Sequence, residues 1–438
     1  MLSPRTDDLD IVRRDSGLPG LGLILDPGQM LERISRHPML ESVEELELDY
    51  VRYKPGMNCL GRYRFLVDGK PAWAYAKAFS NESRAKLDKV AQSANECGPS
   101  ESSLVLPDWS VFVSFFPGDF KLRSIARLSD PDAKARLFRR VFAEPEGWVD
   151  SEAQILNYKP ERRLVLRLTS ADQKSATLKF HTRREFERLA RVGKMFRHAP
   201  EIVMSRHIGQ SRKHGCYAYE WIEGETLRSR LGRIGSALEP HREAGRLIAE
   251  FHGATASSRI ENLIPAEPPE LLSLTDQLGF LIPDLADEAR RLAVALQDLE
   301  GANAARSRLI HGDFYDKQII VSGDNHGLID LDCVRLGDIH QDLACFLAHR
   351  ERQILNGSAS RASVSPDVVP AFLGGYVEAG GGYSEAQLCR WTAWHLLRLS
   401  HHPFRDRVPD WADQTRLMLS RAAQLLDAHA LPQLIATG

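Results

Sequence analysis

The sequence predicts an α+β protein in which strand-rich segments come first and helices dominate the C-terminal half. Apolar and polar residues alternate in segments 164–168 and 176–180, which is the period of a half-buried strand. Because 438 residues exceed one ordinary domain, two or three cores are expected. Helical apolar spacing marks residues 183–196, 240–252, 368–376, 385–399 and 411–430.

Charge and cysteine usage exclude several classes of protein. With 57 basic and 59 acidic side chains the formal charge is −2, so nucleic acid is not an implied partner. The six cysteines are scattered without a CxxC pair, which indicates free core thiols and a reducing cytoplasm. Neither a run of 18 apolar residues nor an apolar leader segment occurs, so no membrane span is predicted. The oligomeric state stays open.

The most informative stretch places two carboxylates on either side of a predicted hairpin. Asp313 lies in segment 311–318, and Asp330 follows 17 residues later, beyond turn residues 322–327. Transfer of a γ-phosphoryl group needs a base that orients the acceptor hydroxyl and oxygen ligands for a metal. Asp313, Gln318 and Asp330 are the candidates for these roles.

The same segment resembles the HGDxxxxN motif of the aminoglycoside phosphotransferase and choline kinase superfamily, whose fold is like that of protein kinases. The resemblance implies ATP and Mg²⁺ as cofactors, Asp313 as the catalytic base, and Gln318 with Asp330 as metal ligands. Most members carry Asn at the position of Gln318, but maltokinase-like members also carry Gln there. Segment 337–344 is similar to the family's GDxxxDLA segment, which begins a helix and is structural.

Residues 155–180 have the character of a kinase-type N-lobe. Lys179 alternates with the apolar residues of its predicted strand and therefore points to the face opposite Leu178. In a kinase-like lobe this lysine contacts the nucleotide phosphates and is held by a Glu of the next helix. Glu185 is favoured for that partner over Glu187, and the choice between them is open.

Two further segments follow the kinase pattern. Segment 217–227 resembles the family's hinge strand, in which backbone groups near Glu220 and Ile222 would pair with adenine and Trp221 would frame the pocket. The turn expected to cover the phosphates, 158–163, contains no glycine, so its cationic side chains are candidates to replace close backbone contacts. His252 ends a predicted helix and is interpreted as structural.

An internal repeat precedes this lobe. Segment 53–65 parallels 158–168, and the matched positions of the Tyr, Lys and Gly residues are separated by 105, 102 and 106 residues. No second HGD segment follows the first copy, so we expect it to serve as a cap or support. Lys77 and Glu82 imitate a Lys–Glu pair there, and Lys77 is expected to be exposed.

These observations predict a protein-kinase-like, α+β, two-lobed fold with an additional N-terminal N-lobe-like domain. The expected function is ATP- and Mg²⁺-dependent phosphorylation of a hydroxyl on a small polar molecule, with sugars, amino sugars and aminoglycosides as the implied classes. The alternative is a pseudokinase that binds nucleotide or regulates. The predicted domains are 1–145, 146–230 and 231–438. Candidates for contact with the acceptor include Asp316, Trp391, Trp394 and His395, although aromatic residues on a helix usually belong to the core.

Overall fold

In the computed structural model the chain forms two compact units. The first unit comprises Met1–Phe186, Ile208–Tyr219 and His402–Ala412. The second unit comprises Glu187–His207, Glu220–His401 and Asp413–Gly438. The structure describes residues 6–97, 102–193, 203–233, 238–253, 271–300, 308–323 and 325–427.

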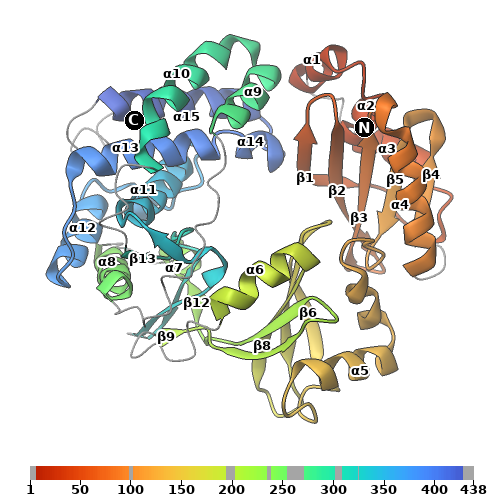
Figure 1. The fold of residues 1–438 in the computed structure, drawn as a ribbon, viewed down its shortest axis with the longest axis horizontal. Helices are drawn as coiled ribbons and strands as arrows, with labels where there is room; N and C mark the ends of the chain where they lie inside the picture. The colour runs from red at the N-terminus through yellow and green to blue at the C-terminus, as the bar shows by residue number, and fades with distance from the viewer. Residues whose placement is uncertain are drawn as a thin grey trace. The chain divides into compact units, whose positions relative to one another are not determined.

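The first unit contains two five-stranded sheets with the same topology (Figure 1). The first sheet has the order β1-β2-β3-β5-β4, and the second has the equivalent order β6-β7-β8-β11-β10. Helix α4 (Arg84–Cys97) follows the third strand of the first sheet, as α6 (Arg183–Gly193) follows that of the second. The first-sheet strands are β1 (Glu47–Lys54), β2 (Asn58–Val67), β3 (Lys70–Phe79), β4 (Ser103–Leu106) and β5 (Val111–Phe115). The second-sheet strands are β6 (Glu152–Lys159), β7 (Arg163–Thr169), β8 (Ser175–His181), β10 (His207–Ser211) and β11 (Cys216–Glu220).

The repeat also includes the helix before each sheet, which the sequence comparison missed. Helix α3 (Pro27–Ile34) and helix α5 (Pro131–Val141) both begin with a proline preceded by aspartate. The Asp26 side chain accepts a hydrogen bond from the backbone of Gln29, and Asp130 accepts one from Ala133. Asp26 and Asp130 are 104 residues apart, so each copy carries the same N-capped helix.

Helix α5 packs on one face of the second sheet. Its apolar residues form a core with the alternating leucines of β7 and with Leu178 and Phe180 of β8. The helix therefore lies on the second sheet, although it precedes residue 146. The buried residues of this core include Leu137, Phe138, Val141, Leu164, Leu166 and Leu168.

The second unit combines a small sheet, a two-stranded pair and most of the helices. The sheet has the order β12-β14-β15-β9, and β13 pairs with β16. Its strands are β9 (Val203–Met204), β12 (Glu225–Thr226), β13 (Arg308–Ile310), β14 (Ile319–Ser322), β15 (Asn325–Leu328) and β16 (Arg335–Gly337). Its helices are α7 (Leu227–Leu231), α8 (Leu238–Gly253), α9 (Leu271–Leu281), α10 (Ala286–Leu296), α11 (His340–Leu355), α12 (Val368–Glu378), α13 (Glu385–Leu399) and α15 (Trp411–Asp427).

Helices α8 and α12 approach each other closely through glycine. A Cβ on Gly245 would collide with the backbone of Phe372, and one on Gly375 would collide with the backbone of Arg242. The glycines thus let the two backbones come into contact. Helix α8 also contacts β13, the strand that precedes the loop with Asp313. The short helices of the first unit are α1 (Thr6–Arg14), α2 (Leu21–Leu25) and α14 (His402–Arg405).

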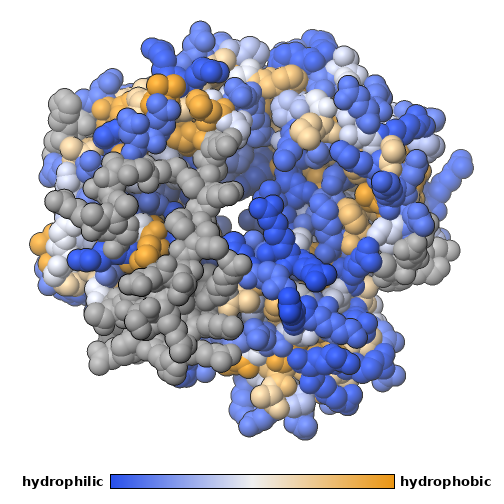
Figure 2. Space-filling view, in the orientation of Figure 1, coloured by the Kyte–Doolittle hydropathy of each residue, from blue (hydrophilic) through white to orange (hydrophobic). Residues whose placement is uncertain are grey.

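The helices expected from apolar spacing are confirmed within the described residues; the ends predicted at 194–196 and 428–430 lie outside them. Among the helices that the structure describes, none is both long and apolar enough to span a bilayer. Figure 2 shows a face dominated by hydrophilic side chains, with apolar ones in small patches. Five cysteines are free thiols, as expected: Cys59, Cys216, Cys333, Cys345 and Cys389.

Candidate active site

The second unit confirms the predicted hairpin between the two carboxylates. Strands β14 and β15 pair antiparallel, with Ile319 opposite Leu328. Asp313 lies in the loop that enters β14, and Asp330 follows β15, so both belong to the same end of the hairpin. Both residues are partly exposed, whereas the strand residues between them are mostly buried.

The loop that carries Asp313 is fixed by Asp342 in the first turn of α11. Asp342 accepts hydrogen bonds from the backbone N–H of His311 at 2.6 Å and of Gly312 at 2.7 Å. Gly312 has a φ of +79°, and a Cβ there would collide with the carbonyl of Cys333, so only glycine fits. The segment similar to GDxxxDLA therefore has the structural role that was predicted.

Two histidines extend this anchoring. His252 of α8 contacts Asp342 through Nε2 at 3.0 Å and the Tyr376 hydroxyl through Nδ1 at 3.0 Å, which confirms its structural role. Burial acts to raise the pKa of Asp342, but the hydrogen bond and charge of His252 hold that pKa below its ordinary value. His311 Nε2 lies 3.0 Å from the carbonyl oxygen of Ile329, which ties the loop to the residue before Asp330.

Gln318 and Asp330 lie at one end of the hairpin, because the N–H of Ile329 donates to the carbonyl of Gln318 at 3.0 Å. Asp330 has a left-handed backbone (φ +60°), which aspartate tolerates better than most residues. An anionic carboxylate and a neutral amide oxygen are hard donors of the kind that bind Mg²⁺. The donor set thus fits the metal that the sequence implies.

The surroundings of Asp313 include a cation that sequence reasoning missed. Arg398 of α13 lies 3.8 Å from the Asp313 carboxylate. Ligand atoms of Asp313, Cys345 and His349 lie within 4.8 Å of one another. Burial, aided by the charge of Arg398, holds the pKa of His349 well below its usual range, so this histidine is neutral. The sequence signal for this cation was Arg398 itself, a charged residue one helical turn after His395 in an otherwise apolar helix.

The four candidates for contact with the acceptor belong to the interior. Asp316 is held by Arg228, whose Nε and Nη2 donate to its two carboxylate oxygens at 2.6 and 2.9 Å. Trp391, Trp394 and His395 are at most 3% exposed on α13. The burial of the three α13 side chains agrees with the expectation that aromatic residues on a helix belong to the core, and Asp316 is occupied by its ion pair.

In the first unit, Lys179 occupies the face of β8 opposite the sheet's core, as predicted. It is 7% exposed, pairs with Val165 across the strands, and lies 5.2 Å from the ring centroid of Tyr219. The register pairs Lys159 with Arg163 at the base of the β6–β7 turn, on the same face as Lys179. Three cations therefore belong to one face at one end of this sheet. Glu185 lies in the first turn of α6.

The hinge segment connects the second sheet to the hairpin. The Glu220 N–H donates to the carbonyl of Arg206 at 2.7 Å, and its own carbonyl accepts from Ser205 Oγ at 2.7 Å. Both Glu220 backbone groups thus already have partners. Strand β12 begins three residues after Ile222 and pairs with β14 of the hairpin. Gly224 has a φ of +133° and passes against the backbone of Val321, where no side chain would fit.

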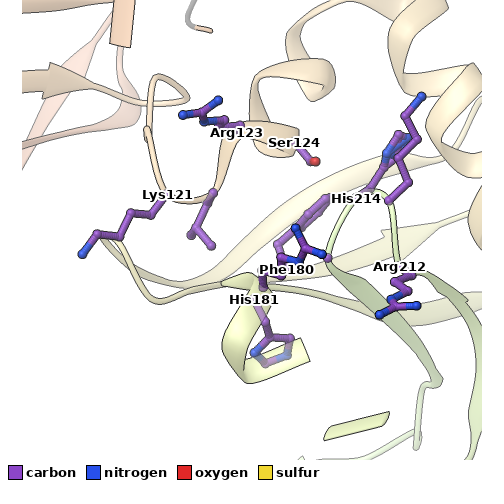
Figure 3. Close-up of a pocket in the computed structure, with 11 residues that line it drawn as sticks. Lys121, Arg123, Ser124, Phe180, His181, Arg212 and His214 are labelled. Atoms are coloured by element: carbon purple, nitrogen blue, oxygen red, sulfur yellow. The ribbon is translucent and has the colours of Figure 1, made fainter. Parts of the chain in front are cut away.

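A cavity of about 450 Å³ lies elsewhere in the first unit (Figure 3). It is bounded by Lys121–Ser124, by the end of β8 and by the β10–β11 turn, and no acidic side chain among the described residues lines it. Burial, aided by nearby positive charge, lowers the pKa of His214 in its wall to about 4. In Figure 3 Lys121 extends away from Arg212 and His214. None of the candidate site residues lines this cavity.

The sequence matches the phosphotransferase enzyme family over residues 146–391, which is more than half of the chain. The chain belongs to this family. The match includes the second sheet, the loop with Asp313 and the hairpin, and it begins after the first sheet. The protein is therefore a small-molecule phosphotransferase with a hydroxyl acceptor, and the predicted family and its protein-kinase-like α+β fold are confirmed.

Solved structures of other phosphotransferases are similar to this chain at low identity. A choline/ethanolamine kinase family protein from Mesorhizobium loti is 15% identical with a TM-score of 0.46, covering 70% of this chain and 100% of that one. Choline kinase from Cryptosporidium parvum Iowa II is 11% identical with a TM-score of 0.45, covering 68% and 95%. No curated protein matches the sequence.

Proposed function

We propose that this phosphotransferase uses ATP and Mg²⁺ to phosphorylate a hydroxyl of a sugar, amino sugar or aminoglycoside-like molecule. The observation that carries the proposal is the loop at 311–318, whose backbone is fixed by Asp342 so that Asp313 and Asp330 belong to one end of a rigid hairpin. Fixing these groups before substrate binds reduces the reorganisation that the reaction would otherwise need.

Asp313 orients the acceptor hydroxyl and accepts its proton as the hydroxyl oxygen attacks the terminal phosphorus, whose bond to the bridging oxygen breaks so that ADP leaves. Arg398 lies close enough to keep this carboxylate in place from one side. Gln318 and Asp330 would hold the metal, and a bound metal would neutralise charge on the phosphate oxygens. Asp330 is the stronger of the two ligands because it carries a full negative charge.

The nucleotide is bound by the second sheet and the hinge. Lys179 contacts the phosphates, with Glu185 as its partner, and Lys159 and Arg163 add positive charge where a protein kinase has glycines. The adenine lies against Trp221, with backbone groups of Glu220 and Ile222 as its hydrogen-bond partners. Since Glu220 already uses its N–H within the sheet, the Ile222 backbone is the main polar contact.

The base is tested by Asp313→Asn. Turnover should fall by on the order of 10²- to 10⁴-fold while the affinity for Mg·ATP stays within about twofold, because the amide keeps the shape of the loop but not its basicity. Asp276→Asn, an exposed carboxylate on α9, is the control and should leave turnover unchanged. Wild-type turnover in Asp313→Asn would remove the proposed mechanism.

The metal ligands are tested separately. Asp330→Ala should abolish Mg²⁺-dependent nucleotide binding, whereas Gln318→Asn should remain partly active because it keeps an amide oxygen on a shorter stem. The acceptor is sought by measuring ATP consumption against a panel of sugars, aminoglycosides and amino alcohols. Mg·ATP binding to Asp330→Ala with wild-type affinity would place the metal elsewhere.

A further inference from the structure

A carboxylate from the second sheet fills the lysine site of the first. Lys77 Nζ lies 2.8 Å from both carboxylate oxygens of Glu161, which belongs to the β6–β7 turn. Arg52 Nη2 contacts the same carboxylate at 2.8 Å, and Lys121 Nζ contacts it at 2.9 Å. The Glu161 side chain is fully buried, and Lys77 is only 8% exposed. The expectation that Lys77 is exposed was therefore wrong, and the exposed Glu82 is not the carboxylate that it contacts.

Glu161 holds this position at a cost to its backbone. Its φ is +61°, a left-handed conformation that costs a residue with a Cβ ~1–2 kcal/mol. The equivalent residue of the first copy is Gly56, which has a φ of +68°. A glutamate thus stands where the repeat uses glycine, and such an outlier persists only when the surrounding contacts compensate for it.

A second buried carboxylate fixes the backbone of the same turn. Asp119 accepts hydrogen bonds from the Glu161 N–H at 2.6 Å and from the Tyr158 hydroxyl at 3.0 Å. In the first copy, Asp15 accepts from the Gly56 N–H at 2.9 Å and from the Tyr53 hydroxyl at 2.6 Å. The turn anchor is therefore duplicated, but only the second turn adds a side chain that enters the other copy.

The charged groups of this cluster shift one another's pKa values. Burial acts to raise the pKa of Glu161, but Lys77, Arg52 and Lys121 outweigh it and hold that pKa below its ordinary value. Burial also lowers the pKa of Lys77, and the Glu161 carboxylate opposes that shift. With three cations on one carboxylate, we take the contact as an ion pair at neutral pH.

We propose that the first copy acts as a clamp that positions the β6–β7 turn for nucleotide binding, with Glu161 as the positioning residue. The proposal rests on the proposed function, in which this turn covers the phosphates. The turn is flanked by Lys159 and Arg163, which the register places on the face of Lys179. Because the clamp fixes the turn between these two cations, releasing it lets both of them move away from the phosphates.

The test is Glu161→Gln, which keeps the size of the side chain but removes its charge. Its affinity for Mg²⁺ with a non-hydrolysable ATP analogue should fall about tenfold, and KM for ATP should rise equally, with kcat changed by less than about threefold. Hydrogen exchange of the amides at 158–163 should accelerate in the variant without nucleotide. A loss of folded protein alone would lower apparent kcat and leave KM unchanged.

The repeat supplies a matched control. Asp119→Asn and Asp15→Asn each weaken a buried anchor that holds a turn N–H and a tyrosine hydroxyl, so both should destabilise folding. Asp119 also accepts from the backbone N–H groups of Lys121 and Leu122, so its replacement should destabilise folding more. Only Asp119→Asn should raise KM for ATP, because only its turn belongs to the nucleotide site. Equal KM values for these two variants would overturn the clamp.

Two outcomes separate this inference from the proposed function. Wild-type protein that binds no nucleotide would contradict the proposed function itself, and the clamp would fall with it. Nucleotide binding by wild-type protein, with unchanged affinity and turn exchange in Glu161→Gln, would overturn the clamp alone. Lys121→Met removes the most exposed of the three cations. It should change nucleotide affinity, KM for ATP and amide exchange in the same direction as Glu161→Gln, but by less.

Discussion

The two sheets of the first unit share a backbone plan but differ in what meets the lysine of the third strand. Both have the same strand order, an Asp–Pro helix start and an aspartate that fixes the first turn. In the first sheet Lys77 contacts a protein carboxylate, whereas the family resemblance assigns Lys179 to phosphate. The register position of Arg163 is Asn58 in the first copy, which therefore has one cation fewer.

The two copies have therefore kept the same backbone anchors, while the equivalent lysine has a different partner in each copy. The second copy is followed by the hairpin with Asp313 and Asp330, and the family match begins within that copy, after α5. The first copy is followed by the second, whose turn supplies Glu161. Function thus depends on the site and not on the fold alone.

The largest expected effect separates the two lysines. Lys179→Met should lower kcat/KM by on the order of 10²-fold, because it removes charge that stabilises the phosphates. Lys77→Met should lower kcat/KM only about tenfold but cost ~3–5 kcal/mol of folding free energy, because it strips the buried Glu161 carboxylate of its closest cation. Steady-state kinetics and urea unfolding measure the two effects, and equal profiles for the variants would break the comparison.

A smaller effect is expected at the turns. Gly56→Ala should cost about 1 kcal/mol, since it forces a Cβ into the left-handed region. Glu161→Gly relieves that strain but leaves the cations around it without their carboxylate, so a net loss of ~2–4 kcal/mol is expected. Urea unfolding of both variants tests this order, and a stabilised Glu161→Gly would contradict the ion-pair interpretation.

The smallest effect is a dependence on pH. The pKa of Glu161 is lowered by folding, so its ion pairs stabilise the protein above the unfolded value of about 4.3 and are lost as pH falls through the lowered pKa. The stability difference between wild type and Glu161→Gln should therefore be largest near pH 7 and shrink below about pH 4. A difference that grows on acidification would have the wrong sign.

Local patterns in the sequence predicted most of the second unit. The hairpin between Asp313 and Asp330, the helix ending near His252 and the anchoring role of segment 337–344 followed from short-range spacing and motif chemistry. These features depend on residues close in sequence or on backbone geometry that the motif requires.

Contacts between distant segments were not predictable in the same way. Lys77 and Glu161 are 84 residues apart, so Glu82 looked like the closer partner although it is exposed. Asp316 fell within the catalytic motif, but the arginine that holds it comes from α7. Sequence comparison detected the repeat only from residue 53 onward. The helices α3 and α5, which precede the two sheets, share their capping residues and little else in sequence.

The first copy is proposed to support the second and not to form a second nucleotide site. Isothermal titration of the full chain with Mg²⁺ and a non-hydrolysable ATP analogue should give one equivalent per chain in wild type and, with weaker affinity, in Lys77→Met. Lys179→Met should bind far more weakly. Two equivalents in wild type, the second lost in Lys77→Met, would contradict the claim.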